Sequence, residues 1–510
     1  MNQALFIPIA IPAMTAAVLV LLSRYTLSIQ RVISVIATLI QLPVALWLYS
    51  LAGDGETRVY LLGSWPPPFG IVLVLDRLSA TMLLLAAFLS CAVVLAALGI
   101  WDQRGRHFHA LFQFQLLGIF GAFLTGDLFN LFVFFEVLLI ASYGLMLHGG
   151  GARRLRAGFH YVAINLVGST IFLFAIGTIY AVTGTLNMAD IAVKVREVAP
   201  GNEALLATGG LLLLVVFAIK SAMVPLQWWL PPTYGTTSPP AAALFAIMTK
   251  VGAYSIIRMY TLAFGPDAGA LAGLATPWIL PAAIVTLVFG TIGVVASRTI
   301  ADLVCYSVVA SMGTLLIAVG LNSPDGIAAA LYYTAQSTLT SAGLFLLAGL
   351  LVRDGHEHIP YALAAPPTQH ATTLAGLFFL LAIAMVGMPP LAGFLGKLLI
   401  LDAGRAAAQT AILWPVILGT SLFLILGFAR AGIAIFWASK PPEQDSPHAL
   451  PFRPVPVGVI SALLVALASL SIFAGPVMSD MSATSAQLLD PQLYIRAVLD
   501  SVPVTTAMGQ

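Results

Sequence analysis

The sequence predicts an all-α integral membrane protein with about fourteen transmembrane helices, and three observations favour this fold class. Of its 510 residues, 60% are hydrophobic and 8% are charged, whereas about a quarter of the residues in an ordinary soluble domain are charged. The apolar residues form runs of about twenty, the length that crosses a lipid bilayer. These runs are continuous and do not alternate in polarity, which favours helices over a β-barrel.

The apolar runs give the order of the expected helices, and no soluble domain is expected between them. The runs lie at residues 4–23, 31–51, 72–99, 108–125, 127–147, 158–182, 205–230, 239–262, 276–297, 300–321, 327–352, 371–402, 410–437 and 455–476.

The two ends of the chain carry different signals. The first run, from Ala4 to Leu22, is preceded by no Lys or Arg. A cleavable signal peptide has a basic start and a shorter apolar core, so we expect this run to remain as the first transmembrane helix. After Met478 the chain is too polar to span a membrane. Its segment 490–499 begins with Asp–Pro, a favourable helix start, and is expected to lie along the membrane surface.

Lys and Arg residues in the loops predict the orientation, because cytoplasmic loops are enriched in them. Alternate loops, beginning with the first, hold eleven such residues, and the opposite loops hold five. The first loop is therefore predicted to be cytoplasmic and both termini to lie outside. Arg77 and Arg258 are expected near outer helix ends, where long side chains reach water, and His148 and His160 are also expected to face water. The eleven are Arg24, Arg31, Arg104, Arg106, Arg153, Arg154, Arg156, Arg298, Arg353, Lys440 and Arg453, and the five are Arg58, Lys194, Arg196, Arg405 and Arg496.

Two apolar runs are interrupted by proline in a similar way. In the first, Pro225 follows Lys220 by five residues, and in the second, Pro389 and Pro390 precede Lys397. Proline removes a backbone donor and disrupts a helix. Two interrupted segments about 170 residues apart are typical of transporters with inverted repeats, whose ion path lies at the breaks.

Four ionisable residues lie deep in apolar sequence, namely Glu136, Lys220, Lys250 and Lys397. At about 1.5 Å per residue, Glu136 is roughly 14 Å into its helix and Lys250 roughly 17 Å, close to the middle of a bilayer core about 30 Å thick. Each charge costs at least about 2.5 kcal/mol on insertion scales. Apolar residues would pack at no such cost, which points to a function.

Two interpretations of these four residues remain open. In the first, Glu136 pairs with one lysine and locks helices together, which leaves two lysines unexplained. In the second, the four form a proton relay. Burial disfavours the charged form of a lysine and a neighbouring carboxylate favours it, so the carboxylate can switch the lysine between holding and releasing a proton. Polar side chains in nearby helices could connect them through water, or could simply bond helix to helix. These candidates are Asn165, Ser169, Tyr254, Ser307, Ser311, Tyr332, Tyr333 and Gln336.

No cofactor or metal site is expected from the sequence. Cys91 and Cys305 both lie in apolar runs and have no spacing typical of a thiolate metal site. The stretch His356–Glu357–His358 lies on a polar loop and is more simply explained by solvation than by metal binding. No nucleotide-binding glycine motif is present.

Three segments resemble the antiporter-like family. They read TGDLFNLFVFFEVLLIASYGL, FAIKSAMVPLQWWLPP with SPPAAALFAIMTKVGAYSIIR, and GMPPLAGFLGKLLIL. This family comprises subunits of Mrp-type cation/proton antiporters and the proton-pumping subunits of respiratory complex I and related hydrogenases. The resemblance runs from about Leu75 to Trp437. Within the family the chain is most similar to the MrpD (PhaD) group, by the first of these segments, the tail DPQLYIRAVL and its length.

The resemblance implies a domain organisation and a role for each buried charge. Residues 1–107 would form the first three helices, 108–262 the first repeat half, 263–440 the second, and 441–510 the last helix and tail. The two halves would be inverted repeats with Pro-broken helices. Glu136 and Lys220 would be the switch of the first half-channel, Lys250 the connecting residue, and Lys397 the terminal lysine of the second.

The sequence departs from the family pattern at several relay positions. Ser311 and Gln336 stand where relatives often have His, Ser341 stands where some have Lys, and Pro232 where Asp is common. Ser311, Tyr332 and Gln336 therefore remain candidate relay residues that titrate less readily, so water would have to carry more of the path.

We therefore expect a subunit of a multisubunit Na⁺(K⁺)/H⁺ antiporter in a bacterial inner membrane, with the other antiporter subunits as partners and no cofactor. Two alternatives remain. The chain could be a proton-pumping subunit of an NADH:quinone oxidoreductase or a membrane hydrogenase, which neighbouring genes would reveal. It could also be a scaffold whose charges only hold helices together, which transport assays on charge variants would reveal.

Overall fold

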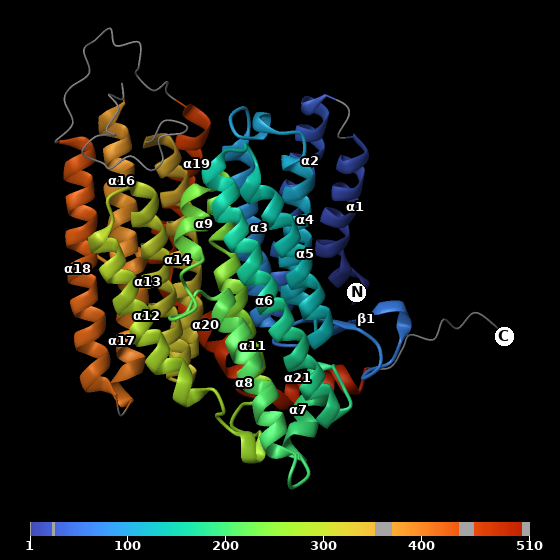
Figure 1. Cartoon of the computed structure of the whole chain (residues 1–510). Coiled ribbons are helices and arrows are strands. Elements are labelled where there is room, and N and C mark those ends of the chain that lie inside the picture. The colour runs from blue at the N-terminus through green and yellow to red at the C-terminus, as the bar shows by residue number, and fades with distance from the viewer. Residues whose placement is uncertain (1, 23–25, 352–369, 408, 438–452, 502–510) are drawn as a thin grey trace.

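Long helices lie side by side and make up nearly all of the molecule (Figure 1). The computed structural model of the chain describes residues 2–22, 26–351, 370–407, 409–437 and 453–501. The long helices are α1 (Ile7–Leu21), α2 (Leu27–Ala52), α3 (Arg77–Ala97), α4 (Phe108–Leu124), α5 (Leu128–Leu147), α6 (Ala152–Thr183), α8 (Glu203–Lys220), α12 (Thr276–Ala296), α13 (Ile300–Gly320), α14 (Pro324–Leu351), α18 (Thr410–Phe436) and α19 (Pro454–Ile472).

Shorter elements connect or interrupt these helices. The shorter helices are α7 (Met188–Arg196), α9 (Leu230–Thr236), α10 (Pro239–Phe245), α11 (Met248–Leu262), α16 (Ala371–Val386), α17 (Ala392–Ala403), α20 (Ala474–Leu488) and α21 (Pro491–Leu499). The strands are β1 (Arg58–Leu61) and β2 (Val72–Leu75), and the 3₁₀ turns are η1 (Asn2–Phe6), η3 (Leu62–Ser64), η4 (Asp102–Arg104), η5 (Gly269–Leu271) and η6 (Gly404–Ala406).

The predicted class, an all-α protein that crosses a membrane many times, is confirmed. In the described part of the chain, twelve helical segments are long and apolar enough to cross a membrane. The apolar helices α4 and α16, of 17 and 16 residues, are not among these twelve and occupy the two other predicted places. The number of fourteen crossings itself stays a prediction.

The helices differ in how deeply they are buried, and this difference separates a central group from a peripheral one. The most apolar part of segment 239–262 is entirely buried, and that of α13 is 94% buried. In α1, α2, α18 and α19 the corresponding share is 33%. The central helices therefore face protein on all sides, whereas the peripheral helices present apolar side chains to lipid or to partners.

The prediction of one helix over residues 72–99 is wrong at its start. Residues 72–75 form β2, which pairs with β1 in antiparallel register, Arg58 opposite Leu75 and Leu61 opposite Val72. α3 begins at Arg77 because Asp76 caps it. The Asp76 carboxylate accepts from the Ser79 amide at 2.9 Å, and the Ser79 hydroxyl accepts from the Asp76 amide at 2.9 Å, a capping box.

The prediction for Arg258 is also wrong, because this side chain does not reach toward water. Arg258 is 4% exposed and donates two hydrogen bonds to Asp76, at 2.5 and 2.8 Å. The pair lies against the Tyr494 ring, whose centroid is 5.1 Å from the guanidinium carbon. Arg77, by contrast, is partly exposed and pairs with Asp480 at 2.7 Å. Asp76 thus both caps α3 and ties it to α11.

Loss of this buried pair is expected to destabilise the fold strongly. Asp76→Asn leaves the Arg258 charge buried without a carboxylate, which costs about 3–5 kcal/mol. We expect a clear fall in the thermal unfolding temperature of the purified complex, followed by intrinsic fluorescence. The matched control is Asp267→Asn, since Asp267 is exposed and pairs with Arg196 at 3.3 Å, where loss costs at most about 1 kcal/mol. Equal stability of the two variants would contradict the structural role of Asp76.

A helix is present in the tail segment where the sequence predicted one. α21 begins after Asp490, whose carboxylate accepts from the Gln492 amide at 3.2 Å. It is joined by α20, which the sequence did not predict. Both lie at the lower end of the bundle in Figure 1, where α21 packs against α7. The Ser485 hydroxyl donates to the Pro324 carbonyl at 2.7 Å, so the tail is fastened to α14.

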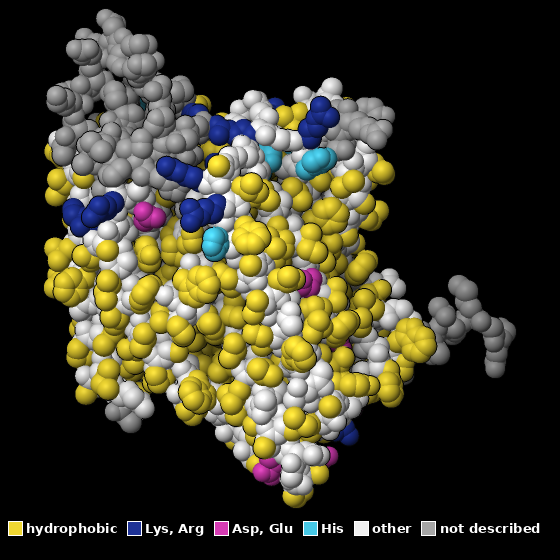
Figure 2. Space-filling view, in the orientation of Figure 1, with side chains coloured by type: hydrophobic (Ala, Val, Ile, Leu, Met, Phe, Trp, Pro, Cys, Tyr) yellow, Lys and Arg dark blue, Asp and Glu magenta, His cyan; other side chains and the backbone are white. Residues whose placement is uncertain are grey.

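The two sets of loops lie at opposite ends of the molecule. In Figure 1 the C-terminal end of α1 and the start of α2 lie at the upper end, whereas β1, α7 and α21 lie in the lower half. Figure 2 shows Lys and Arg side chains gathered near the upper end of this face, above a largely hydrophobic surface. We call this upper end the basic-loop end.

Of the two histidines expected to face water, one does not. His160 is exposed, as predicted. His148 is 7% exposed, and its Nε2 donates to the Trp101 carbonyl at 2.8 Å. It therefore fastens the end of α5 to the loop before α4 rather than facing solvent.

Candidate functional site

The three predicted lysines are buried at interruptions of the helices. Lys220 is the last residue of α8, and Lys397 lies in the second turn of α17, directly after the proline break. Lys250 is near the start of α11, just after a break at residues 246–247 that the sequence did not predict. Their exposed fractions are 6%, 6% and 0%. Each lysine is therefore close to a helix end, where backbone N–H or C=O groups lack hydrogen-bond partners within the helix.

Glu136 lies at mid-depth as predicted, but it is less buried than the lysines. It is eight residues, or about 12 Å, from the start of α5, a 20-residue helix about 30 Å long. Its side chain is partly exposed. Phe129, Val133 and Ile140 are exposed on the same face of α5, at helical spacing from Glu136. This stripe is apolar except for the carboxylate.

Glu136 and Lys220 do not form the direct ion pair that the sequence suggested. Instead, each contacts a polar residue on α6. The Ser169 hydroxyl donates to the Glu136 carboxylate, and Lys220 Nζ donates to Asn165 Oδ1 at 2.8 Å. Asn165 and Ser169 are four residues apart and so share one face of the helix. The two charges are therefore joined through one turn of α6.

The end of α8 is held open by side chains that satisfy its freed backbone groups. Trp229 Nε1 donates to the Ile219 carbonyl at 2.9 Å, and the Val224 amide donates to the Thr286 hydroxyl at 2.9 Å. A helix broken inside a membrane needs such partners. The break beside Lys220 is thus a built feature of the fold.

Lys250 is the most isolated of the lysines. Its Nζ has no hydrogen-bond partner among the described residues, and neither has the Ser221 hydroxyl. α11 passes close to the end of α8, since a Cβ on Gly252 would lie 2.6 Å from Ser221 Oγ. Lys250 is two residues before Gly252, so it lies within one turn of the point where α11 meets the end of α8. The last residue of α8 at this point is Lys220.

Lys397 lies at the second proline break and uses a carbonyl that the break exposes. Its Nζ donates to the Val386 carbonyl at 2.7 Å and to the Ser421 hydroxyl at 2.8 Å. Val386 is the last residue of α16. At this break the Val386 carbonyl is therefore satisfied by the Lys397 side chain and not by a further turn of α16.

The three candidate relay residues differ in their hydrogen bonds. Gln336 Nε2 donates to the Ala384 carbonyl at 2.8 Å, and its Oε1 has no partner among the described residues. The Ser311 hydroxyl is also buried and without such a partner. The Tyr332 hydroxyl donates to the Leu470 carbonyl at 3.0 Å. Gln336 thus lies at the same break as Lys397, whereas the hydroxyl of Tyr332 is fixed to α19.

Sequence reasoning missed several residues of the site. Asn165 and Ser169 appeared only among many polar candidates, although they contact Lys220 and Glu136 directly. Ser421, Thr286 and Ser221 were not singled out at all. A hydroxyl in an apolar helix is common, so only the three-dimensional arrangement distinguishes these residues from ordinary helix-to-helix contacts.

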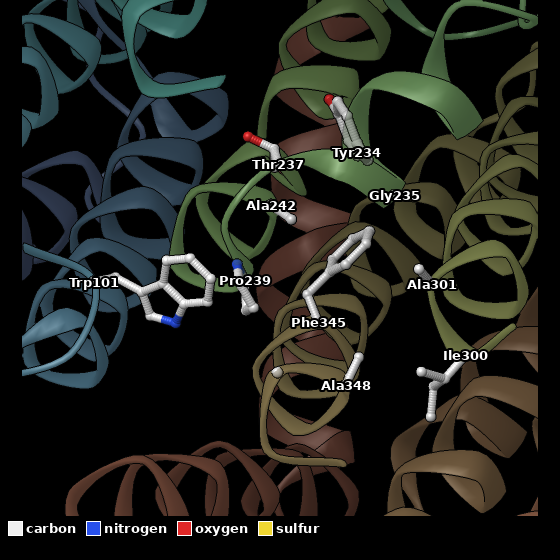
Figure 3. Close-up of a pocket in the computed structure, with 11 residues that line it drawn as sticks. Trp101, Tyr234, Gly235, Thr237, Pro239, Ala242, Ile300, Ala301, Phe345 and Ala348 are labelled. Carbon is white, nitrogen blue, oxygen red and sulfur yellow. The ribbon is translucent and has the colours of Figure 1, made fainter. Parts of the chain in front are cut away.

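A small cavity lies at the basic-loop end of the central helices (Figure 3). Its volume is about 40 Å³, enough for one or two water molecules. Trp101 faces it from the loop before α4, Pro239 from the start of α10, Ile300 from the start of α13, and Phe345 from α14. Water at this place would lie at the start of the segment that carries Lys250.

In the described part of the chain, no three residues of the His, Cys, Asp and Glu types gather in a way that could hold a metal ion. The stretch 356–358, considered from the sequence, lies outside the described residues. Cys91 and Cys305 are buried, free thiols.

Comparison with known proteins gives a consistent result along the chain. The family described as NADH:quinone oxidoreductase/Mrp antiporter, transmembrane, matches residues 125–423. The chain is 40% identical to a protein of Rhizobium meliloti (strain 1021) named as a probable K(+)/H(+) antiporter subunit of the D type, over 98% of each. It is 35% identical to the D-type Na(+)/H(+) antiporter subunit of Bacillus subtilis (strain 168), over 98% of this chain and all of the relative.

Solved structures show the same fold. A chain in the structure of the Mrp complex from Dietzia sp. DQ12-45-1b matches with a TM-score of 0.86 and 27% identity, over 98% of this chain and 100% of that one. A chain of respiratory complex I from Thermus thermophilus matches with a TM-score of 0.76 and 24% identity, over 96% and 99%. The second likeness concerns the fold alone.

Proposed function

Because the chain belongs to the NADH:quinone oxidoreductase/Mrp antiporter family of membrane subunits, we propose that it is the MrpD-type subunit of a multisubunit Na⁺ or K⁺/H⁺ antiporter. Its relatives over the full length are named subunits of such antiporters. The partners are the other subunits of the complex. The membrane is a bacterial inner membrane, with the basic loops in the cytoplasm and both termini outside.

One observation carries the proposal that this chain conducts protons. Glu136 and Lys220 are linked through Ser169 and Asn165 on one face of α6, and Lys220 and Lys397 both lie at breaks in the helices. A merely structural charge would be expected to have a direct counter-ion, yet no carboxylate pairs with Lys220, Lys250 or Lys397 among the described residues. Such lysines can exchange a proton with ordered water.

The contacts support one order for the proposed path. The first half-channel contains Glu136, Ser169, Asn165 and Lys220. Lys250 follows at the junction of α8 and α11, and its unpartnered Nζ requires a water contact. Ser311 and Gln336 offer further unpartnered oxygens toward the second break, where Lys397 ends the path. The halves 108–262 and 263–440 would then each hold one proline-broken helix.

The surface of α5 supports the need for a partner subunit. Glu136 is partly exposed within an otherwise apolar stripe, and a carboxylate that faces lipid is costly. A neighbouring subunit that covers this stripe would remove the carboxylate from lipid. It could also deliver protons to Glu136.

The proposal predicts antiport by the complete complex and none by this chain alone. Reconstitute the intact complex in liposomes with an acidic lumen, add Na⁺ or K⁺ outside, and follow the luminal pH with a fluorescent dye. We expect cation-driven proton flux without any electron donor. The isolated chain should give no such flux, because hard cations prefer clustered oxygen ligands and the described residues offer no carboxylate cluster.

Two results would count against this assignment. Flux that appears only after NADH and a quinone are added would favour the redox-driven alternative. Robust Na⁺- or K⁺-driven exchange by the isolated chain would show that the chain is a complete antiporter and not one subunit of a shared mechanism.

A further inference from the structure

A wide groove at the basic-loop end has no role in the proton path. It lies between the first turns of α6 and the segment that follows the break in α8, and its volume is about 360 Å³. From α6 it is lined by Arg153, Arg156, His160 and Ile164, and from the other side chiefly by Trp228 and Trp229. It therefore combines a basic rim with an apolar and aromatic wall.

The cations of the groove are free to bind an anion. Arg153 and Arg156 are exposed, and neither guanidinium makes a hydrogen bond or ion pair with any residue that the structure describes. His160 Nδ1 donates to the Arg156 carbonyl at 2.9 Å, which leaves Nε2 for another partner. No Asp or Glu of the described part of the chain lines the groove, so no described carboxylate opposes its charge.

The polarity of α6 favours an anion at the same place. The first turn of a helix carries a partial positive charge and ordinarily prefers acidic residues. The first turn of α6 has none, its N-cap residue Gly151 provides no side-chain cap, and arginines stand there instead. A bound anion would offset both the arginine charges and the helix dipole.

Below the basic rim, an apolar stripe continues down α6 into the membrane. After Ile164 come Val167, Ile171 and Phe174 at helical spacing, and Val167 and Phe174 are 58% and 67% exposed. Trp228 is 57% exposed beside the rim, and tryptophan favours the level of lipid head groups. The cationic rim, the interfacial tryptophan and the apolar stripe follow one another from the start of α6 into the membrane. This is the order of the head group and the acyl chains in a phospholipid.

We propose that this groove binds a net-anionic phospholipid, with its phosphate between Arg153 and Arg156 and an acyl chain along the stripe of α6 from Ile164 to Phe174. Charge complementarity favours this occupant, because a zwitterionic head group would bring its own cation to an unopposed basic rim. Since Trp229 also bonds the Ile219 carbonyl at the break of α8, the lipid would lie against the segment that keeps this break open.

The test uses the intact complex in nanodiscs that contain phosphatidylcholine and a photoreactive phosphatidylglycerol with its reactive group on an acyl chain. After illumination and chymotryptic digestion, mass spectrometry measures labelling of the α6 peptides. We expect saturable labelling between residues 157 and 174. In the double variant Arg153→Gln/Arg156→Gln, half-saturation should require about thirty-fold more probe, because each arginine near an anionic lipid contributes about a factor of five.

The matched control is the double variant Arg106→Gln/Arg298→Gln. Both arginines are exposed at the same end, and neither lines the groove, so the net charge falls equally while labelling should stay as in the wild type. The proposal is overturned if the two double variants lose labelling equally, or if a phosphatidylcholine probe labels α6 as well as phosphatidylglycerol does. It is also overturned if α6 is not labelled in the intact complex, which would mean that a partner subunit covers the groove.

Discussion

Replacing Lys397 with alanine is expected to abolish cation-driven proton flux while the antiporter complex remains assembled. Among the described residues, Lys397 Nζ hydrogen-bonds to the Val386 carbonyl and the Ser421 hydroxyl and to no carboxylate, so no counter-ion holds its proton at the second break. A positioned group that gives and takes protons contributes about a hundred-fold or more to a rate. We expect a loss of at least that size in proteoliposomes.

Two controls separate this loss from damage to the fold. Lys194→Ala removes an exposed lysine on α7 and should leave transport unchanged. Ser421→Ala removes one partner of Lys397 but keeps the bond to Val386, and it should lower the flux only partly. Transport is normalised to the amount of complex recovered by affinity purification. If Lys397→Ala retains full antiport, the lysine is structural and the second half-channel lies elsewhere.

Much of the fold could be predicted from the sequence because a helix that crosses the bilayer needs about twenty consecutive, mostly apolar residues. Continuous apolar runs located most of the long helices to within a few residues, although α6 begins at Ala152, before its run, and α8 ends at Lys220, well before the end of its run. Prolines located two of the interruptions. The strands β1 and β2 were missed because Val72–Leu75 is apolar and joins the run of α3 without a gap. Only the capping box of Asp76 and Ser79 separates the two, and a short polar signal of this kind is weak within an apolar run.

The burial of the lysines could be predicted, but their partners could not. Hydropathy predicted that Glu136, Lys220, Lys250 and Lys397 lie deep within apolar helices; the structure buries the three lysines among the helices and leaves Glu136 partly exposed. Which side chain each one contacts depends on helix rotation and crossing. The sequence therefore suggested a direct bond between Glu136 and Lys220, where α6 in fact lies between them. For the same reason Arg258 was expected to reach water, although it bonds to Asp76.

Replacing Glu136 gives a sharper test of the proposed mechanism, because three substitutions separate charge from geometry. Glu136→Gln keeps an oxygen that accepts from the Ser169 hydroxyl, so the contact to α6 survives while the titratable group is lost. Glu136→Asp keeps the titratable group but shortens the reach toward Ser169. Glu136→Ala removes both. The order of their activities therefore reports which property transport needs.

We expect Glu136→Gln to lose antiport nearly as completely as Glu136→Ala, by about a hundred-fold or more, and Glu136→Asp to keep part of it. The reason is that Glu136 influences Lys220 across one turn of α6 through its charge, not through a direct bond. When the carboxylate is ionised it stabilises the charged lysine, and when it is protonated the lysine releases its proton more readily. An amide can do neither.

A scaffold predicts the opposite order, since the amide of Glu136→Gln preserves the contact with Ser169 and holds α5 against α6. Antiport is measured in inverted membrane vesicles for all three variants and normalised to assembled complex. Glu203→Gln, at the exposed start of α8, serves as the matched control and should transport normally. Near-normal transport by Glu136→Gln would remove the charge switch and leave helix packing as the better account of this residue. Loss in both Gln and Ala variants, with partial activity in Asp, would require an ionisable group at this depth of α5, which packing alone does not need.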